Sequence, residues 1–180
     1  MYPKRRCFLN LEGTHIPRQQ FDPQLDWGKI ARIRDMWGGK LILKGVLDEE
    51  DARRAADFGA DAMIVSNHGG RQLDGALSSI RRLPSIARAV GDQVEVWMDG
   101  GIRSGQDVLK ALAMGAKATM IGRSYIYGLG AMGQAGVSAA LEVIRKEIDT
   151  TIALCGERDI AKFGAHNLMI PKDFEGDWKD

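Results

Sequence analysis

The sequence has little of what marks several large protein classes. It contains two cysteines, Cys7 and Cys155, which have neither the spacing of a metal site nor the density of a disulfide scaffold. No apolar run approaches the roughly 20 residues that span a membrane. The basic start Lys4-Arg5-Arg6 is not followed by the apolar core of a signal peptide. With a net charge of +1, nothing points to a nucleic acid partner. These absences predict a reduced, cytoplasmic protein.

The length and the glycine and proline pattern predict one domain with irregular ends. A chain of 180 residues is long enough to bury a single core. Residues 1–25 lack periodicity and are interrupted by prolines and a glycine, so they predict an irregular arm. Residues 26–160 carry the periodic elements, and residues 161–180 form a tail of mixed signals.

Short apolar runs alternate with helical patterns along residues 26–160. Four strands are expected at 41–46, 62–66, 94–98 and 118–121. Helices are expected at 26–37, 49–58, 78–90, 106–114, 124–131 and 134–154, with Pro84 as a break or a second start inside the third. This alternation predicts an α/β fold of adjacent parallel strands in chain order. The continuous apolar run at 41–46 further predicts a sheet covered on both faces.

Polar residues follow the end of each predicted strand. They are Lys44, His68 with Arg71, the Asp99–Arg103 segment, and Gly122 with Arg123. Functional residues at the carboxyl ends of parallel strands are typical of a TIM barrel. Four β/α units amount to half of such a barrel.

The stretch Ser66-Asn67-His68-Gly69-Gly70-Arg71-Gln72-Leu73-Asp74 is the most informative. Two glycines allow a sharp turn directly after the strand, so the histidine and the arginine are displayed at its carboxyl end. An imidazole can take a proton near neutral pH, and a guanidinium can hold a carboxylate with two parallel hydrogen bonds. The pattern therefore predicts that His68 is a base and that Arg71 is an anion clamp. The alternative is that both are ordinary loop residues.

Two glycine-rich segments and one lysine predict a phosphate-binding cofactor site. The segment 99–105 precedes a helix, and Gly122-Arg123 repeats the arrangement one unit later. Backbone N–H groups at a helix start favour phosphate, and barrels often bind it after strands seven and eight. Tight βα turns are the alternative interpretation. Lys44 is costly to bury without a partner unless its ammonium extends to water.

The nonapeptide resembles the active-site segment of the FMN-dependent 2-hydroxy-acid oxidoreductases, which include lactate and mandelate dehydrogenases and glycolate oxidase. The resemblance implies that His68 is the catalytic base and that Arg71 holds the substrate carboxylate. It implies that Lys44 lies beside the flavin and supports its reduced form. It also implies that the other FMN-binding residues are Asp99, Gly101, Arg103, Gly122 and Arg123. The similar glycine segments of IMP dehydrogenase leave a phosphate-binding fragment of that type as an alternative.

The resemblance covers about residues 21–160 and corresponds only to the carboxyl-terminal half of a family member. A truncated, split or fragmentary form of an L-lactate-like dehydrogenase is therefore expected. The strands at 41–46 and 118–121 would have free edges, which predicts self-association or pairing with an amino-terminal half. An inert half-barrel is the second alternative. The resemblance to quinone-linked members also implies a peripheral link to the inner face of the membrane.

Overall fold

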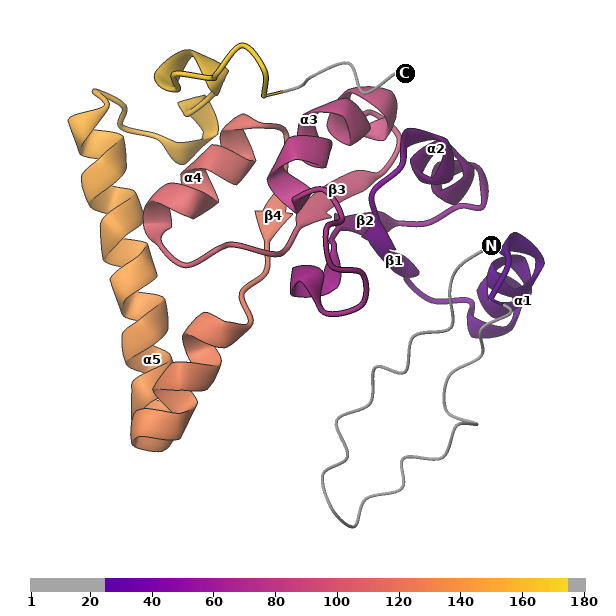
Figure 1. The fold of residues 1–180 in the computed structure, drawn as a ribbon, viewed down its shortest axis with the longest axis horizontal. Coiled ribbons are helices and arrows are strands. Elements are labelled where there is room, and N and C mark those ends of the chain that lie inside the picture. The colour runs from indigo at the N-terminus through magenta and orange to yellow at the C-terminus, as the bar shows by residue number, and fades with distance from the viewer. Residues whose placement is uncertain (1–24, 175–180) are drawn as a thin grey trace.

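The computed structural model describes residues 25–174, so the predicted arm lies almost entirely outside the described residues. Four parallel strands form one sheet (Figure 1). They are β1 (Ile42–Val46), β2 (Ala62–Val65), β3 (Glu95–Met98) and β4 (Ala118–Thr119). Their order in the sheet is their order in the chain, which confirms the predicted topology. β4 is shorter than the predicted strand, because only its first residues pair with β3.

Five helices in residues 25–174 precede, connect and follow the strands. They are α1 (Trp27–Trp37), α2 (Glu49–Asp57), α3 (Ser79–Val90), α4 (Gly105–Ala113) and α5 (Arg123–Leu154), with short 3-10 turns η2 (His68–Gly70), η3 (Ile160–Lys162) and η4 (Ala165–Asn167). The side chains of Asp26 and Asp48 cap α1 and α2, as their positions predicted. Pro84 does not break α3, and its side chain is buried with the apolar face that holds the helix on the sheet.

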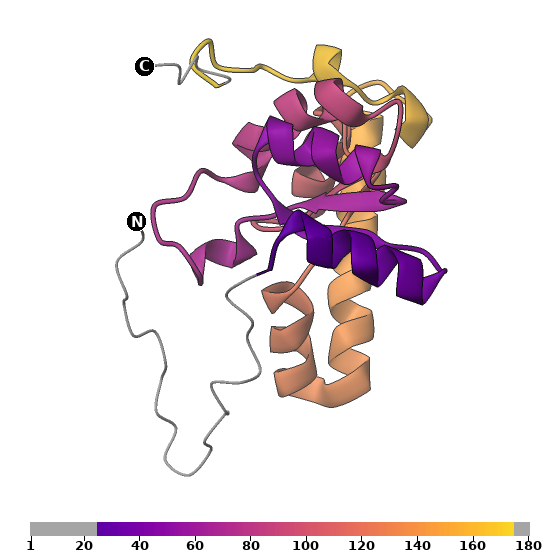
Figure 2. The same ribbon diagram turned by 90° about the vertical axis from the view of Figure 1, so that its right-hand side faces the viewer.

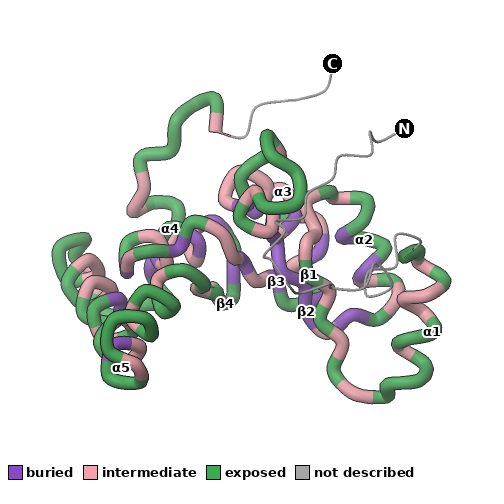
Figure 3. The backbone as a smooth tube through the Cα atoms, turned by 60° about the horizontal axis from the view of Figure 1, so that its bottom comes forward, coloured by how far each residue is buried: buried purple, intermediate pink, exposed green. Residues whose placement is uncertain are grey.

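The core lies between the sheet and α2, α3 and α4. Alternate residues of β2 and β3 face these helices. The cluster includes Met63, Val65, Val96 and Met98 from the strands and Ala52, Ala55, Leu83, Ile86, Val90 and Ala111 from the helices. Figure 3 shows the buried residues concentrated here, while α5 is mostly exposed. No residue of β1 is fully buried, so the prediction of coverage on both faces is wrong for this strand, whereas all four residues of β2 are buried. As an edge strand, β1 has a neighbour on one side only.

Helix α5 consists of two segments that fold back on each other (Figures 1 and 2). Its backbone is non-helical at Met132 and Gly133, where a break between two helices was expected. The segments approach most closely at Gly128 and Gly136. A Cβ added to Gly136 would lie 1.9 Å from the carbonyl oxygen of Gly128, so only glycine fits this crossing. The second segment packs against α4, where Glu147 accepts a hydrogen bond from the backbone N–H of Gly105 at 2.7 Å.

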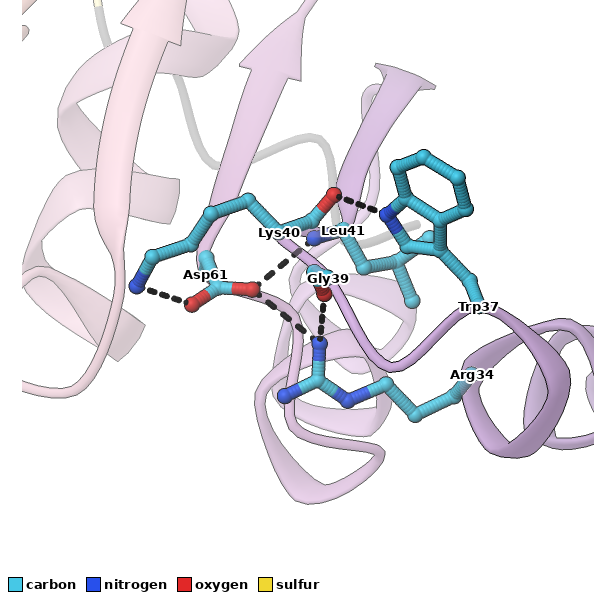
Figure 4. Close-up of polar contacts among 6 residues, drawn as sticks. All are labelled: Arg34, Trp37, Gly39, Lys40, Leu41 and Asp61. Carbon is cyan, nitrogen blue, oxygen red and sulfur yellow. Dashed lines mark hydrogen bonds and ion pairs between the residues drawn. The ribbon is translucent and has the colours of Figure 1, made fainter.

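Asp61 holds together the chain segments that enter β1 and β2 (Figure 4). Its carboxylate contacts Nζ of Lys40 at 2.6 Å and Nη1 of Arg34 at 3.1 Å. It also accepts a hydrogen bond from the backbone N–H of Leu41 at 2.8 Å. These contacts, led by the hydrogen bond from Lys40, lower the pKa of Asp61 from 3.8 to about 2. The cluster anchors α1 and β1 at the amino ends of the strands.

Part of the predicted tail packs on the domain. Phe163 is buried, and Leu168 and Phe174 lie against the core cluster. Arg81 of α3 places its guanidinium 5.9 Å from the ring centroid of Phe174. Residues between the last predicted helix and residue 174 therefore pack against the core cluster and α3.

Candidate active site

A cavity of about 820 Å³ lies at the carboxyl ends of the strands. The eight predicted site residues all line it: Lys44, His68, Arg71, Asp99, Gly101, Arg103, Gly122 and Arg123. They come from the ends of all four strands, as the parallel topology requires. Met120 and Ile121, predicted as strand residues, lie in the cavity wall instead. The sequence therefore located the cavity, while the role of each side chain remains a prediction.

One backbone conformation and two contacts fix the position of His68. Its backbone is left-handed, with φ of 56°, which is uncommon for a residue other than glycine and is often found at functional sites. Its N–H donates a hydrogen bond to Oγ of Ser66 at 3.1 Å. Its ring lies against Gly45 of β1, since a Cβ added there would be 2.6 Å from Cε1 of His68. The imidazole is thus held at the mouth of the cavity beside the end of β1.

Lys44 is neither unpaired nor simply extended to water. Its ammonium lies 2.8 Å from Oδ2 of Asp99 and 3.0 Å from Oγ of Ser66. Within residues 25–174, Ser66 is one of two polar residues that are fully buried, at 1% exposure. Its hydroxyl accepts hydrogen bonds from both Lys44 and the backbone of His68. One buried oxygen therefore links the end of β1 to the start of the histidine turn.

The carboxylate of Asp99 is only partly satisfied. Oδ2 pairs with Lys44, whereas Oδ1 is buried and has no hydrogen-bond partner among the described residues. A buried acceptor without a hydrogen-bond donor costs desolvation free energy, which a bound ligand with a donor group can offset. The neighbouring Gly100 and Gly101 have φ of 87° and 85°, and a Cβ added to Gly101 would meet no atom within 4 Å. The turn after β3 thus places a carboxylate oxygen without a hydrogen-bond donor beside the open space at Gly101.

Three guanidinium groups make the cavity an anion site. The side chains of Arg71, Arg103 and Arg123 have no hydrogen bond or ion pair to any residue of the described ranges. Helix α5 begins at Arg123, and its N-cap Gly122 provides no side-chain hydrogen bond. Free N–H groups at a helix start bind anions together with nearby arginines. The three guanidinium groups are enough to bind two separate anionic groups, such as a phosphate and a carboxylate.

The comparisons with known proteins agree with this geometry. The FMN-dependent dehydrogenase family matches residues 8–170. The chain belongs to this family. Its members are oxidoreductases that use FMN, which confirms the predicted family, fold type and cofactor. The match also disfavours the IMP dehydrogenase alternative.

The relatives at high identity are lactate and mandelate enzymes. An "L-lactate dehydrogenase" of Caulobacter vibrioides (strain NA1000 / CB15N) is 57% identical over 141 residues, which are 78% of this chain and 37% of that protein. An "L-lactate dehydrogenase" of Vibrio cholerae serotype O1 (strain M66-2) is 49% identical over 149 residues, 83% of this chain and 39% of the relative. The chain therefore spans less than half the length of these curated relatives.

Solved structures give the same result. A mandelate oxidase variant with an FMN monooxide adduct superposes with a TM-score of 0.73 and 46% identity, over 76% of this chain and 43% of that one. A mandelate oxidase with benzoyl-formic acid superposes with a TM-score of 0.73 and 44% identity, over 78% of this chain and 44% of the other. The four-stranded sheet is consistent with part of a barrel. Among the described residues, no helix is long and apolar enough to cross a membrane.

The residues present fit FMN. The phosphate would be held by Arg103 and Arg123 at the uncapped start of α5. The unmet Oδ1 of Asp99 supplies an acceptor for an N–H or O–H group of the cofactor. Lys44, which is paired with Asp99, would supply positive charge beside it. These features match the donors, acceptors and charges that a flavin mononucleotide presents.

Sequence reasoning missed two residues of this site. Ser66 stands in the recognised nonapeptide, but nothing in the motif showed that its hydroxyl joins Lys44 to His68. Gly45 follows Lys44, and its contact with the imidazole depends on how β1 and β2 pair. The Lys44–Asp99 ion pair was also missed, because its members are 55 positions apart (99 − 44).

Proposed function

We propose that this chain carries the catalytic and phosphate-binding part of an FMN-dependent dehydrogenase that oxidises an L-2-hydroxy acid of the lactate type to the 2-oxo acid. The observation that carries the proposal is the convergence of His68, Arg71 and the two phosphate-site arginines on one cavity. A base, a carboxylate clamp and a phosphate clamp are the groups that this reaction needs.

The residues divide the work as follows. Arg71 holds the substrate carboxylate with two parallel hydrogen bonds and orients the hydroxyl-bearing carbon. His68 takes a proton from the substrate as the hydroxy acid becomes the 2-oxo acid. FMN, when bound, would accept the two electrons and the second proton that the substrate loses. Lys44 stabilises negative charge beside the cofactor, and Gly101 and Gly122 let the backbone approach it.

Arg103 and Arg123 hold the phosphate in this proposal. Two guanidinium groups and a helix start provide several charge-assisted hydrogen bonds, each worth about 1.5–3 kcal/mol. Neither guanidinium must leave a carboxylate in the described part of the chain before it can bind. Replacing either arginine by methionine should therefore weaken FMN binding roughly ten- to a hundredfold.

We infer that full activity also requires the part of the barrel that the longer relatives contain outside the matched region. The chain spans 37% of the first of these relatives, and flavin affinity is the sum of many contacts. The edges of β1 and β4 and the lightly covered face of β1 are the surfaces where that part, or a second copy, would pair. The chain alone should bind FMN weakly and oxidise L-lactate very slowly.

The test combines this chain with a polypeptide that covers the remaining barrel strands of a lactate dehydrogenase relative. FMN binding is followed by the quenching of flavin fluorescence, and L-lactate oxidation by stopped-flow bleaching of the flavin. Pairing is followed by light scattering during size exclusion. The expected result is a defined complex that binds FMN and is bleached by L-lactate. Full activity of the chain alone would contradict the need for a partner.

Two substitutions in that complex test the roles. His68→Ala should abolish flavin bleaching while FMN stays bound, because the base acts in the chemical step. Arg71→Lys should weaken substrate binding and slow the reaction, because a point charge does not reproduce the guanidinium fork. The matched controls are His166→Ala and Arg53→Lys, both at exposed sites outside the cavity. Unchanged bleaching in the His68 variant would remove its catalytic role.

The location and the electron acceptor form a separate proposal. We place the protein in the cytoplasm, with peripheral contact at the inner face of the membrane if the acceptor is a quinone. The support is the resemblance to quinone-linked lactate dehydrogenases and the scarcity of cysteine. Comparing the rate of flavin reoxidation by oxygen and by a soluble quinone, with and without lipid vesicles, tests this proposal.

A further inference from the structure

We propose that Gly45 is a positioning residue that sets the place of the His68 imidazole, an inference that rests on the catalytic role of His68. Gly45 lies at the end of β1, and His68 lies in the turn η2 just after the adjacent strand β2. A Cβ added to Gly45 would lie 2.6 Å from Cε1, 3.4 Å from Nε2 and 3.6 Å from Nδ1 of His68. The ring therefore occupies the volume that any other side chain at position 45 would need.

A bulge in β1 creates this contact. Lys44 pairs with Ile64 and Val46 with Val65, so Gly45 is an extra residue without a partner on β2. An extra residue interrupts the alternation of side chains and re-aims those beside it. Gly45 has φ of 100°, which L-residues with a side chain rarely adopt. Lys44 thus reaches Asp99 from a regularly paired position, while the next residue, in the bulge, receives the histidine ring.

The other constraints on His68 act on its backbone rather than its ring. The hydrogen bond to Ser66 holds the backbone N–H, and the left-handed conformation sets the direction of the Cβ. Neither ring nitrogen has a hydrogen-bond partner in residues 25–174. Packing on Gly45 therefore restricts a ring that no hydrogen bond holds within the described residues. It leaves both nitrogens available for proton transfer.

The first test observes the contact in the unaltered chain. The sequence has three histidines, so selective isotope labelling gives three imidazole signals by NMR. His68→Gln identifies the signal of His68. A nuclear Overhauser effect between the Hα protons of Gly45 and Hε1 of His68 is expected. Its absence would overturn the proposal whether or not any variant folds.

The second test displaces the ring. Gly45→Ala should shift the His68 imidazole signal, while the signal of His166 stays in place. The control is Gly38→Ala, because Gly38 also has a positive φ of 63° but open space around the added Cβ. It also places a side chain at a positive φ, but without touching the ring. An unchanged His68 signal in Gly45→Ala would overturn the proposal.

The third test separates positioning from chemistry. In the complex with the remaining barrel strands, Gly45→Ala should slow flavin bleaching about 100-fold, since a misplacement of about 1 Å can cost that much. FMN and substrate binding should change little. Failure of the proposed function would appear as unchanged bleaching in His68→Ala. Failure of the positioning role would appear as a displaced ring with normal bleaching in Gly45→Ala alone.

Discussion

The ammonium of Lys44 lies 2.8 Å from Oδ2 of Asp99, although β2 separates their strands in the sheet. The pair spans the end of β2, where Ser66 adds its hydroxyl to the same ammonium. Lys44 is 38% exposed and Asp99 19%, so the pair is only partly shielded from water. It joins the two strand ends that the proposed flavin site requires to stay together.

A double-mutant cycle on this pair should show clear coupling. Lys44→Met leaves the carboxylate of Asp99 without a described partner, and we expect a loss of about 1–2 kcal/mol of unfolding free energy. Lys44→Met with Asp99→Asn should lose less than the sum of the single variants, with coupling of about 1 kcal/mol. Urea unfolding measures all four proteins.

The exposed ion pair of Arg53 and Glu49 provides the matched control for this cycle. It lies on one helix at i,i+4 spacing, with an N–O distance of 3.4 Å. A cycle of Arg53→Met and Glu49→Gln should give coupling of only about 0.3–0.5 kcal/mol. Equal coupling in the two cycles would mean that the pair in the cavity gains nothing from its position.

Ser66→Ala should destabilise the chain more than a typical serine substitution. It removes the acceptor for the His68 N–H and one of two partners of Lys44. Leaving a buried donor unsatisfied costs about 1–3 kcal/mol. Ser85→Ala is the control, because Ser85 is half-buried on α3 and donates only to the carbonyl of Arg82. Similar urea midpoints for the two variants would contradict the bridging role of Ser66.

Asp61 should make stability depend on pH under acid conditions. Its pKa is about 2 in the folded chain against an ordinary value of 3.8, so the unfolded chain binds its proton first as the pH falls. The stabilisation is present above the ordinary value and is lost as the pH falls from about 5 toward 2. Asp61→Asn should therefore lose less stability over this range than the unaltered chain. Identical acid dependence in urea unfolding would rule out this contribution.

Two glycines of α5 should respond to alanine in opposite directions. Gly136→Ala places a Cβ against the backbone of Gly128, so the two segments must separate, at a cost of about 1–3 kcal/mol. Gly130 has no atom within 4 Å of an added Cβ. Gly130→Ala should gain about 0.5–1 kcal/mol, because alanine favours a helix over glycine. Thermal unfolding gives the sign of both changes, and a gain in Gly136→Ala would contradict the close crossing.

The sequence predicted the four strands, their order and the cavity residues, because these depend on local patterns. Apolar runs, helix caps and the segment around His68 are each readable within a few residues. It did not predict that the residues of β1 are only partly buried, since burial depends on which distant segments of the chain pack against the strand. The partners of Lys44 were also beyond it, because they are distant in the chain, and the contact of Gly45 was, because it follows from a bulge in β1.

The Asp61 cluster lies at the strand starts, and the cavity lies at the strand ends. The Asp61 cluster and the residues that line the cavity are thus separated by the length of the sheet, and no side chain belongs to both. A library confined to residues 72–78 would vary the cavity wall at Gln72 while Arg71 and the Asp61 cluster stay intact. Substitutions in the cavity wall at the strand ends should therefore alter ligand recognition without disturbing the Asp61 cluster.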